Sequence, residues 1–127
     1  MKKRYYDEVL LLLKNKKFKE AADKYMELSN IFLKRKDYET SAMLLFLYGL
    51  SLLKIKSPEQ IKIEFNKFFE NIGLSEKILK DTFYFTLMRF IIDVKIYDMK
   101  QYNSNIENLL NILPLFEEEK ELINITE

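Results

Sequence analysis

The sequence predicts an all-α protein, an antiparallel array of about six helices arranged as helical hairpins. Only two glycines and two prolines occur in 127 residues, which leaves little turn chemistry for a β-rich fold. Apolar residues also recur at the spacing of a helical stripe along nearly the whole chain. At this length, and with 48% hydrophobic residues, we expect one domain over residues 1–127.

The first three helices follow from their apolar residues. A stripe that includes Val9 marks a first helix at about 3–15. The second, at about 18–35, has apolar residues on one side and charged residues on the other, so it lies on a surface. The third, at about 38–55, carries no charged side chain between Ala42 and Leu53. Because a helix that is apolar all round is buried between layers, we expect the third helix at the centre.

A capping box marks the start of the fourth helix. Ser57 is its N-cap, Pro58 its first helical residue, and Gln60 completes the box. Gly73 tolerates the left-handed conformation that often ends a helix. The sequence therefore predicts a helix at about 58–72.

The last two helices are predicted from further caps. Ser75 caps a fifth and longest helix at about 76–98. A capping box that begins at Ser104 opens a sixth at about 105–121. Pro114 breaks or restarts that helix, and we interpret its acidic end as frayed.

The absence of cysteine and histidine argues against enzymatic activity. The chain has no cysteine and no histidine, so thiol nucleophiles, thiolate metal sites and the commonest general base are missing. Two glycines cannot form a glycine-rich phosphate loop. Arg89 and Asp93 lie four residues apart on the fifth helix, where we expect a structural ion pair. We therefore expect no cofactor, no metal and no enzymatic activity.

Charge is balanced overall but divided along the chain. Residues 1–63 carry 14 basic and 8 acidic side chains, and residues 64–127 carry 7 and 12. The two halves have net charges of +6 and −5. Opposite charges would allow the acidic half of one chain to associate with the basic half of another. The alternative is that the division is an ordinary feature of solvated helices. Basic clusters at Lys14–Lys19 and Lys34–Lys36 leave a nucleic-acid-associated regulator as a disfavoured alternative.

No segment predicts a membrane span. The longest uninterrupted run of apolar and small residues, Ser41–Leu53, has 13 residues. A helix that spans a membrane needs about 20. The basic start and leucine run at the N-terminus are interrupted by Asp7 and Glu8, unlike a signal peptide. We expect a cytoplasmic protein.

The second and third predicted helices resemble a tetratricopeptide repeat. The stretch FKEAADKY, from Phe18 to Tyr25, has the aromatic, small and aromatic residues of the first repeat helix, and AMLLF, from Ala42 to Phe46, has the Ala-x3-Phe of the second. Pro58 resembles the terminal proline. Tyr25 and Ala42 are 17 residues apart, a surplus of about eight over the standard repeat. The longer hairpin is similar to those of the soluble attachment proteins that work with SNARE-disassembly ATPases.

This resemblance implies a non-catalytic interaction or scaffold module with right-handed stacking of its hairpins. Its first helices would line a concave face that binds a protein, a peptide or a second copy of the chain. The residues that the resemblance places on that face flank the first-helix signature, and the alternative is that they form a solvated helix surface; they are Lys16, Lys19, Asp23, Met26 and Glu27.

Overall fold

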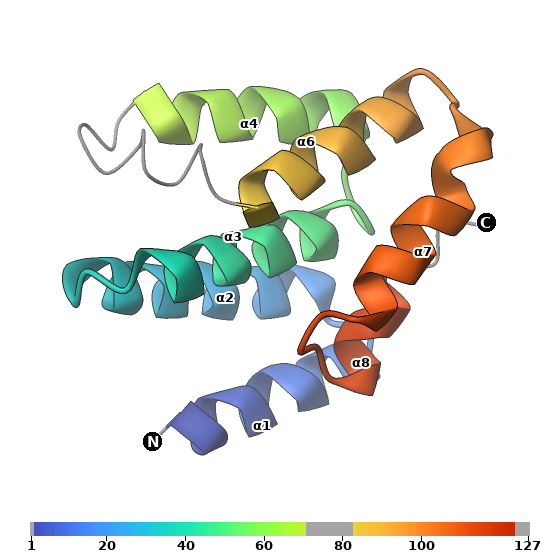
Figure 1. Cartoon of the computed structure of the whole chain (residues 1–127). Helices are drawn as coiled ribbons and strands as arrows, with labels where there is room; N and C mark the ends of the chain where they lie inside the picture. Colours follow the sequence, from blue (N-terminus) through green and yellow to red (C-terminus); the bar gives the residue numbers. More distant parts are fainter. Residues whose placement is uncertain (1, 71–82, 124–127) are drawn as a thin grey trace.

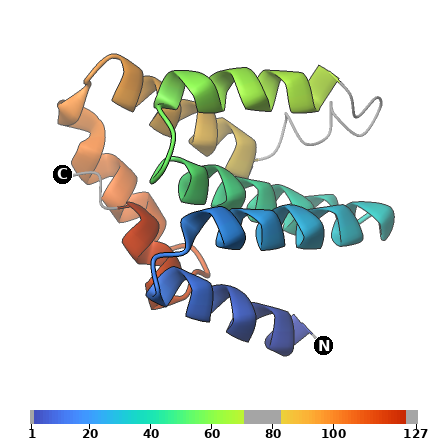
Figure 2. The same cartoon turned by 180° about the vertical axis from the view of Figure 1, so that it is seen from behind.

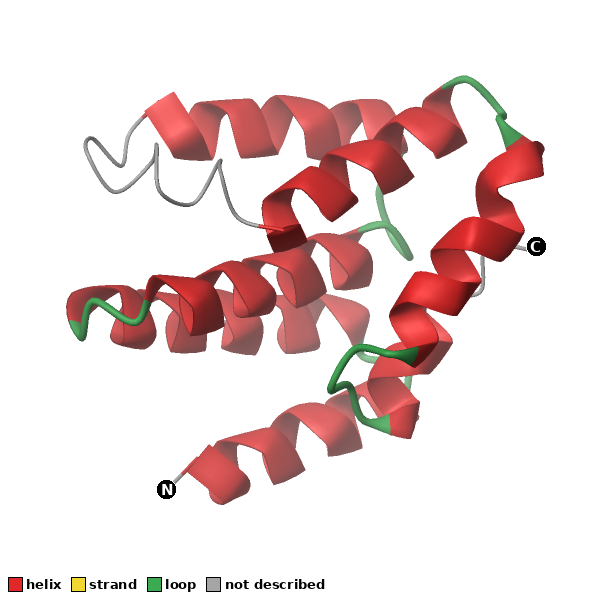
Figure 3. Ribbon diagram, in the orientation of Figure 1, coloured by secondary structure: helices red, strands yellow, loops and turns green. Residues whose placement is uncertain are grey.

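The computed structural model describes residues 2–70 and 83–123, and all regular structure in these residues is helical (Figures 1 and 3). The α-helices are α1 (Lys2–Lys14), α2 (Phe18–Lys34), α3 (Tyr38–Leu52), α4 (Pro58–Glu70), α6 (Phe83–Ile96), α7 (Asn103–Asn111) and α8 (Glu117–Lys120). Short 3-10 helices lie at Lys100–Tyr102 (η1) and Glu121–Ile123 (η2). The all-helical class predicted from the sequence is confirmed for these residues.

The helices are stacked on one another. α2 and α3 pack side by side, α1 packs against α2, and α6 packs against both α3 and α4 (Figures 1 and 2). α7 and α8 lie at one end of this stack, where α8 contacts α1 and η2 contacts α3. The C-terminal part of the chain therefore closes back on its N-terminal part.

α3 is the central helix, as its uncharged sequence predicts. Its buried residues come from all sides of the helix, since Leu44, Leu45, Phe46 and Leu47 follow one another in sequence and are all buried. Such a helix needs neighbours all round, and α2 on one side and α6 on the other provide them.

Small residues let the neighbouring helices come close to α3. Ser29 and Ser41 are buried in the seam of α2 and α3, where the hydroxyl of Ser29 donates to the carbonyl of Ser41 at 3.0 Å and that of Ser41 to the carbonyl of Ser29 at 2.9 Å. At Gly49, an added Cβ would lie 2.8 Å from Sδ of Met88 and 2.9 Å from Cζ of Phe65. The close packing of α3 with α4 and α6 therefore depends on the missing side chain of Gly49.

Successive turns have the same backbone conformation. Lys16 ends the α1–α2 turn with φ 59°, and Lys36, twenty residues later, has φ 62° in the α2–α3 turn. In both, the next residue bonds back to the helix: the N–H of Lys17 donates to Leu12 and that of Asp37 to Phe32. These are Schellman-type helix ends, with lysine at the left-handed position where glycine is usual.

Replacing Lys36 by glycine is expected to stabilise the fold. A side chain in the left-handed region costs about 1 kcal/mol that glycine does not, so the free energy of unfolding should rise by roughly 0.5–1 kcal/mol. Urea denaturation of the purified variant measures this. Lys34→Gly, within the last turn of α2, is the control and should lower the free energy of unfolding by roughly 0.5 kcal/mol. A destabilised Lys36→Gly would contradict the expectation.

The capping box at the start of α4 is confirmed, and so is the helix break predicted at Pro114, whereas the capping box predicted at Ser104 is wrong. The N–H of Gln60 donates to the hydroxyl of Ser57 at 3.3 Å, and the N–H of Ser57 to Gln60 at 3.2 Å. Ser104 does not cap: α7 begins at Asn103, directly after η1, and its N-cap Tyr102 makes no side-chain cap hydrogen bond.

The predicted helix at 105–121 is divided into α7 and α8. α7 ends at Asn111 and α8 begins at Glu117, with Pro114 between them. Proline lacks the N–H that a helix needs and its ring collides with the preceding turn, which explains the break. The predicted features at Gly73 and Ser75 lie outside the described residues.

Candidate functional site

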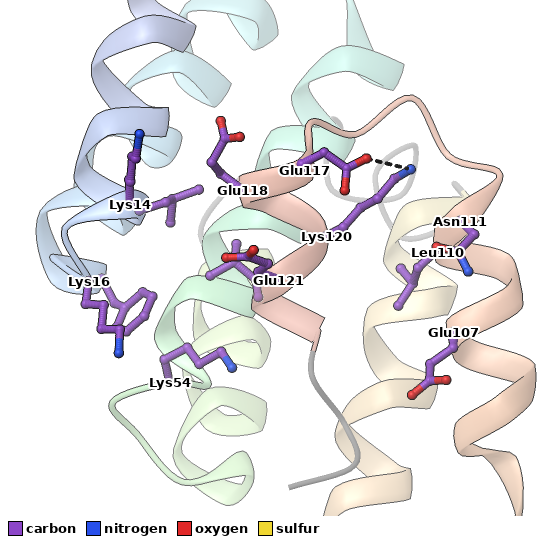
Figure 4. Close-up of a pocket in the computed structure, with 13 residues that line it drawn as sticks. Lys14, Lys16, Lys54, Glu107, Leu110, Asn111, Glu117, Glu118, Lys120 and Glu121 are labelled. Carbon is purple, nitrogen blue, oxygen red and sulfur yellow. Dashed lines mark ion pairs between the residues drawn. The ribbon is translucent and has the colours of Figure 1, made fainter.

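An open hollow of about 760 Å³ lies at the end of the stack where α7 and α8 come next to the α1–α2 turn (Figure 4). α8 stands in its middle, with the α1–α2 turn on one side and α7 on the other (Figure 4). We call this feature the α8 hollow. It is lined by Leu13, Lys14, Lys16, Phe18, Lys54, Glu107, Leu110, Asn111, Glu117, Glu118, Lys120, Glu121 and Leu122.

Basic and acidic side chains face each other in the α8 hollow, between the α1–α2 turn and α8 (Figure 4). Lys14 is the last residue of α1, Lys16 lies in the α1–α2 turn, and Lys54 follows the end of α3. Glu118 and Glu121 lie on the side of α8 that faces this turn (Figure 4). Within the described part of the chain, none of these five side chains takes part in an ion pair within 4 Å. No described residue therefore neutralises these five charges at ion-pair distance.

The floor of the α8 hollow is apolar. Leu13, Leu110 and Leu122 are at most 6% exposed and belong to the main hydrophobic core, and Phe18 packs against that core. Charged side chains thus form the margin of the hollow and apolar ones its base. This combination is common at sites where proteins bind one another, because the base supplies burial and the margin supplies selectivity.

A buried hydrogen bond holds α8 in place. Glu119 is 1% exposed, and its Oε2 accepts from the hydroxyl of Tyr25 on α2 at 2.5 Å. Its Oε1 accepts from the backbone N–H of Phe116 at 3.0 Å. Burial raises the pKa of the Glu119 carboxyl, and these two hydrogen bonds oppose that rise. Both carboxyl oxygens are therefore bonded, although the group is removed from water.

Sequence reasoning missed this anchor. It treated Tyr25 as a space-filling aromatic residue and Glu119 as part of a frayed end, whereas the structure buries both. One signal was present: Leu115, Glu119 and Leu122 lie at i, i+4 and i+7, the spacing of one helical stripe. That stripe places Glu119 between two leucines that face the core, and both leucines are buried.

The five residues predicted to bind a partner lie in different settings. Lys16 lines the α8 hollow. Lys19 and Asp23 form an exposed ion pair with each other at 2.7 Å, and Glu27 pairs with Lys24 on the same helix at 3.7 Å. Met26 is half-buried and packs against the core. The structure therefore brings Lys16 to the hollow and leaves the other four along α2.

A smaller cavity of about 200 Å³ lies between α4 and α6. Lys62 of α4 and Asp93 of α6 form an ion pair at its edge, with 3.5 Å between Nζ and Oδ1. We expected Asp93 to pair with Arg89, and this is wrong: Asp93 binds Lys62, and Arg89 is exposed in the lining of the same cavity. The ion pair of Asp93 is therefore formed with a residue of the neighbouring helix α4, and not with the residue one turn away on α6.

The described residues contain no group of three or more acidic side chains placed to hold a metal ion. None of the helices described is both long enough and apolar enough to cross a membrane. The chain matches no protein-family model, and no similar curated protein or solved structure was found.

Proposed function

We propose that this chain is a non-catalytic interaction module that binds an acidic segment of a partner protein in the α8 hollow. The observation that carries the proposal is the set of three lysines, Lys14, Lys16 and Lys54, which lie at the margin of an open hollow without ion pairs to the described residues. Opposite charges would draw an acidic segment to this margin, and the apolar floor would bury its apolar side chains.

The distribution of basic residues supports a protein segment over a nucleic acid. The turns that contain Lys16 and Lys36 lie at opposite ends of α2, so the two basic clusters do not form one continuous track. A short segment with a few acidic residues fits this narrow basic margin better.

The packing of α2 and α3 supports the tetratricopeptide-like interpretation. Ala21, Ala22 and Ala42 are buried, as are Tyr25 and Phe46. These are the residues that carry the resemblance drawn from the sequence. We infer antiparallel hairpins with right-handed stacking, of the long-hairpin variety, and the resemblance makes peptide binding a natural use of the surface beside them.

Reversing two charges of the hollow is expected to weaken binding at least tenfold. Random peptides displayed on phage and selected against the full chain should be rich in aspartate and glutamate. Their binding to a Lys14→Glu/Lys16→Glu variant should be at least tenfold weaker by isothermal titration, a loss of about 1.4 kcal/mol. Higher salt should weaken the binding to the unmodified chain, because exposed charges are screened.

The chain supplies a matched control for this experiment. Lys34→Glu/Lys36→Glu makes the same change at the equivalent positions of the next turn, where Lys36 has the same left-handed backbone as Lys16. This control should bind the selected peptides like the unmodified chain. Selection without acidic enrichment, or equal binding to both double variants, would rule out the proposed function.

A further inference from the structure

We propose that α8 is an internal ligand of the surface of α1 and α2 beside the α8 hollow: it occupies the place of a partner's acidic segment, whose carboxyl would replace Glu119 on the hydroxyl of Tyr25. This inference rests on the proposed function and adds to it both the chemistry of the partner and a means of regulation. The partner segment has a carboxyl side chain with apolar residues four positions before and three after, the pattern of Leu115, Glu119 and Leu122.

α8 has the form of a docked peptide. It is a four-residue helix, preceded by residues 112–116 outside any regular helix. Leu115, Glu119 and Leu122 are buried, while Ile112 is 78% exposed and Phe116 47% exposed. The contact of α8 with the rest of the protein is thus one short stripe of alternating apolar and acidic character. Such a stripe is easily reproduced by a segment of another protein.

The anchor of α8 favours selectivity over strength. Glu119 is the one charged side chain among the buried residues of the described chain. A carboxyl removed from water stabilises a contact less than an apolar side chain of similar size, because desolvation offsets much of the hydrogen bonding. Tyr25 on α2 therefore selects a side chain that can form a hydrogen bond at this position, and it does so without making the docking of α8 irreversible.

Acidic side chains of α8 lie near basic side chains of the α8 hollow, but they form no ion pairs with them in the described residues. Glu118 and Glu121 face the side of Lys14 and Lys16, yet no pair across the α8 hollow comes within 4 Å in the described residues (Figure 4). The attraction is therefore general and does not depend on one fixed geometry. An acidic segment from elsewhere would experience the same attraction.

α8 lies at the edge of the core, so its release would take Leu115 and Leu122 out of the core and leave the packing of α3 with α2 and α6 in place. α7 and α8 lie at the end of the stack, whereas α3 packs between α2 and α6 (Figures 1 and 2). The contacts of α3 with α2 and of α6 with α4 do not involve α8. Release of α8 would uncover the hydroxyl of Tyr25, which a partner's carboxyl needs.

A peptide copy of the internal ligand tests the inference. The peptide ILPLFEEEKEL, the sequence of residues 112–122, is titrated into the full chain and into a Glu119→Lys variant. A tethered segment acts at an effective concentration of order millimolar, so the peptide should bind the variant at least tenfold more tightly than the unmodified chain. A peptide with alanine in place of its Glu119 should show no such gain.

Two controls separate displacement from unfolding. Glu59→Lys makes the same charge change at an exposed residue of α4, outside the α8 hollow, and should bind the peptide like the unmodified chain. Hydrogen exchange should become faster at residues 112–123 of Glu119→Lys and stay slow in α3. If Glu119→Lys does not fold, Glu119→Ala removes the same carboxyl without adding a charge and carries the same expectation.

Several results would overturn the inference. Equal peptide binding by the unmodified chain and both Glu119 variants would show that α8 does not compete, and unchanged exchange at residues 112–123 would show that Glu119 does not hold it. A dimeric unmodified chain by light scattering, with peptide binding that rises on dilution, would place the α8 of a second copy in the hollow. In each case, peptides that bind through Lys14 and Lys16 would still support the proposed function, so the two proposals fail separately.

Discussion

Replacing Phe46 by alanine is expected to lower the free energy of unfolding by about 3–5 kcal/mol. Phe46 is 1% exposed on the central helix α3, and its ring centroid lies 5.8 Å from that of Tyr84 on α6. The substitution removes a buried ring and leaves a cavity between two helices that cannot close fully, because α3 is also packed against α2. Since domains of this size are stable by about 5–15 kcal/mol, the loss would take most of the stability of a marginal fold.

Phe83→Ala is the matched control. Its ring centroid lies 5.6 Å from the same Tyr84, but Phe83 is 50% exposed. Its loss leaves little cavity, so we expect a cost of about 1 kcal/mol or less. Urea denaturation followed by far-ultraviolet circular dichroism measures both variants. Similar costs for the two substitutions would show that α3 is not the centre of the core.

The fold was predictable from the sequence where local pattern decides the structure. The uncharged run of α3 can be satisfied only at the centre of a helical stack, and Ser57 and Gln60 cap α4 with side chains of the same turn. Local pattern failed at Ser104, where η1 leads straight into α7 and leaves no open helix end to cap.

The candidate site was less predictable, because its parts are distant in sequence. Tyr25 and Glu119 are 94 residues apart, and nothing in the composition around either one identifies the other as its partner. Lys16 was selected through a family resemblance, whereas Lys14 and Lys54 join it in the α8 hollow only because the C-terminal part folds back on α1 and α3. Spacing along one helix cannot reveal such a surface.

Replacing Tyr25 by phenylalanine is expected to lower the free energy of unfolding by about 2 kcal/mol at neutral pH. The ring stays, but Oε2 of the buried Glu119 loses the hydroxyl that donates to it. A buried acceptor without its donor costs about 1–3 kcal/mol, with the higher values for charged groups. In a Glu119→Gln background the same substitution should cost about 1 kcal/mol, because the group left without a partner is neutral.

Denaturation of the unmodified chain, the two single variants and the double variant forms a double-mutant cycle. We expect it to give a coupling free energy of about 1 kcal/mol between Tyr25 and Glu119. The hydroxyl of Tyr25 can form a hydrogen bond with a glutamine as well as with a carboxyl, because it can accept from the side-chain amide N–H of the Glu119→Gln variant. Oε1 of that glutamine can still accept from the N–H of Phe116. A cycle with no coupling would show that the hydrogen bond contributes nothing beyond the packing of the two side chains.

The pH dependence of this pair follows from the burial of Glu119. Burial raises its pKa above the ordinary value of 4.5, so the folded protein holds the proton more tightly than the unfolded chain does. The stability that this proton contributes is complete below the ordinary pKa and is lost as the pH rises through the folded-state pKa. Glu119→Gln, which keeps a neutral group there, should be more stable than the unmodified chain above that pKa, and the difference should shrink in acid.

The comparison between variants isolates Glu119 from the other carboxyl groups, which titrate in both proteins. Glu117→Gln, at a side chain 85% exposed on the same short helix, should change the free energy of unfolding by at most about 0.5 kcal/mol. A Glu119→Gln advantage that is constant from about pH 4 to about pH 8, or that grows in acid, would show that Glu119 is not held as a buried carboxyl. The same carboxyl that joins α8 to Tyr25 thus makes the docking of α8 weaker as the pH rises.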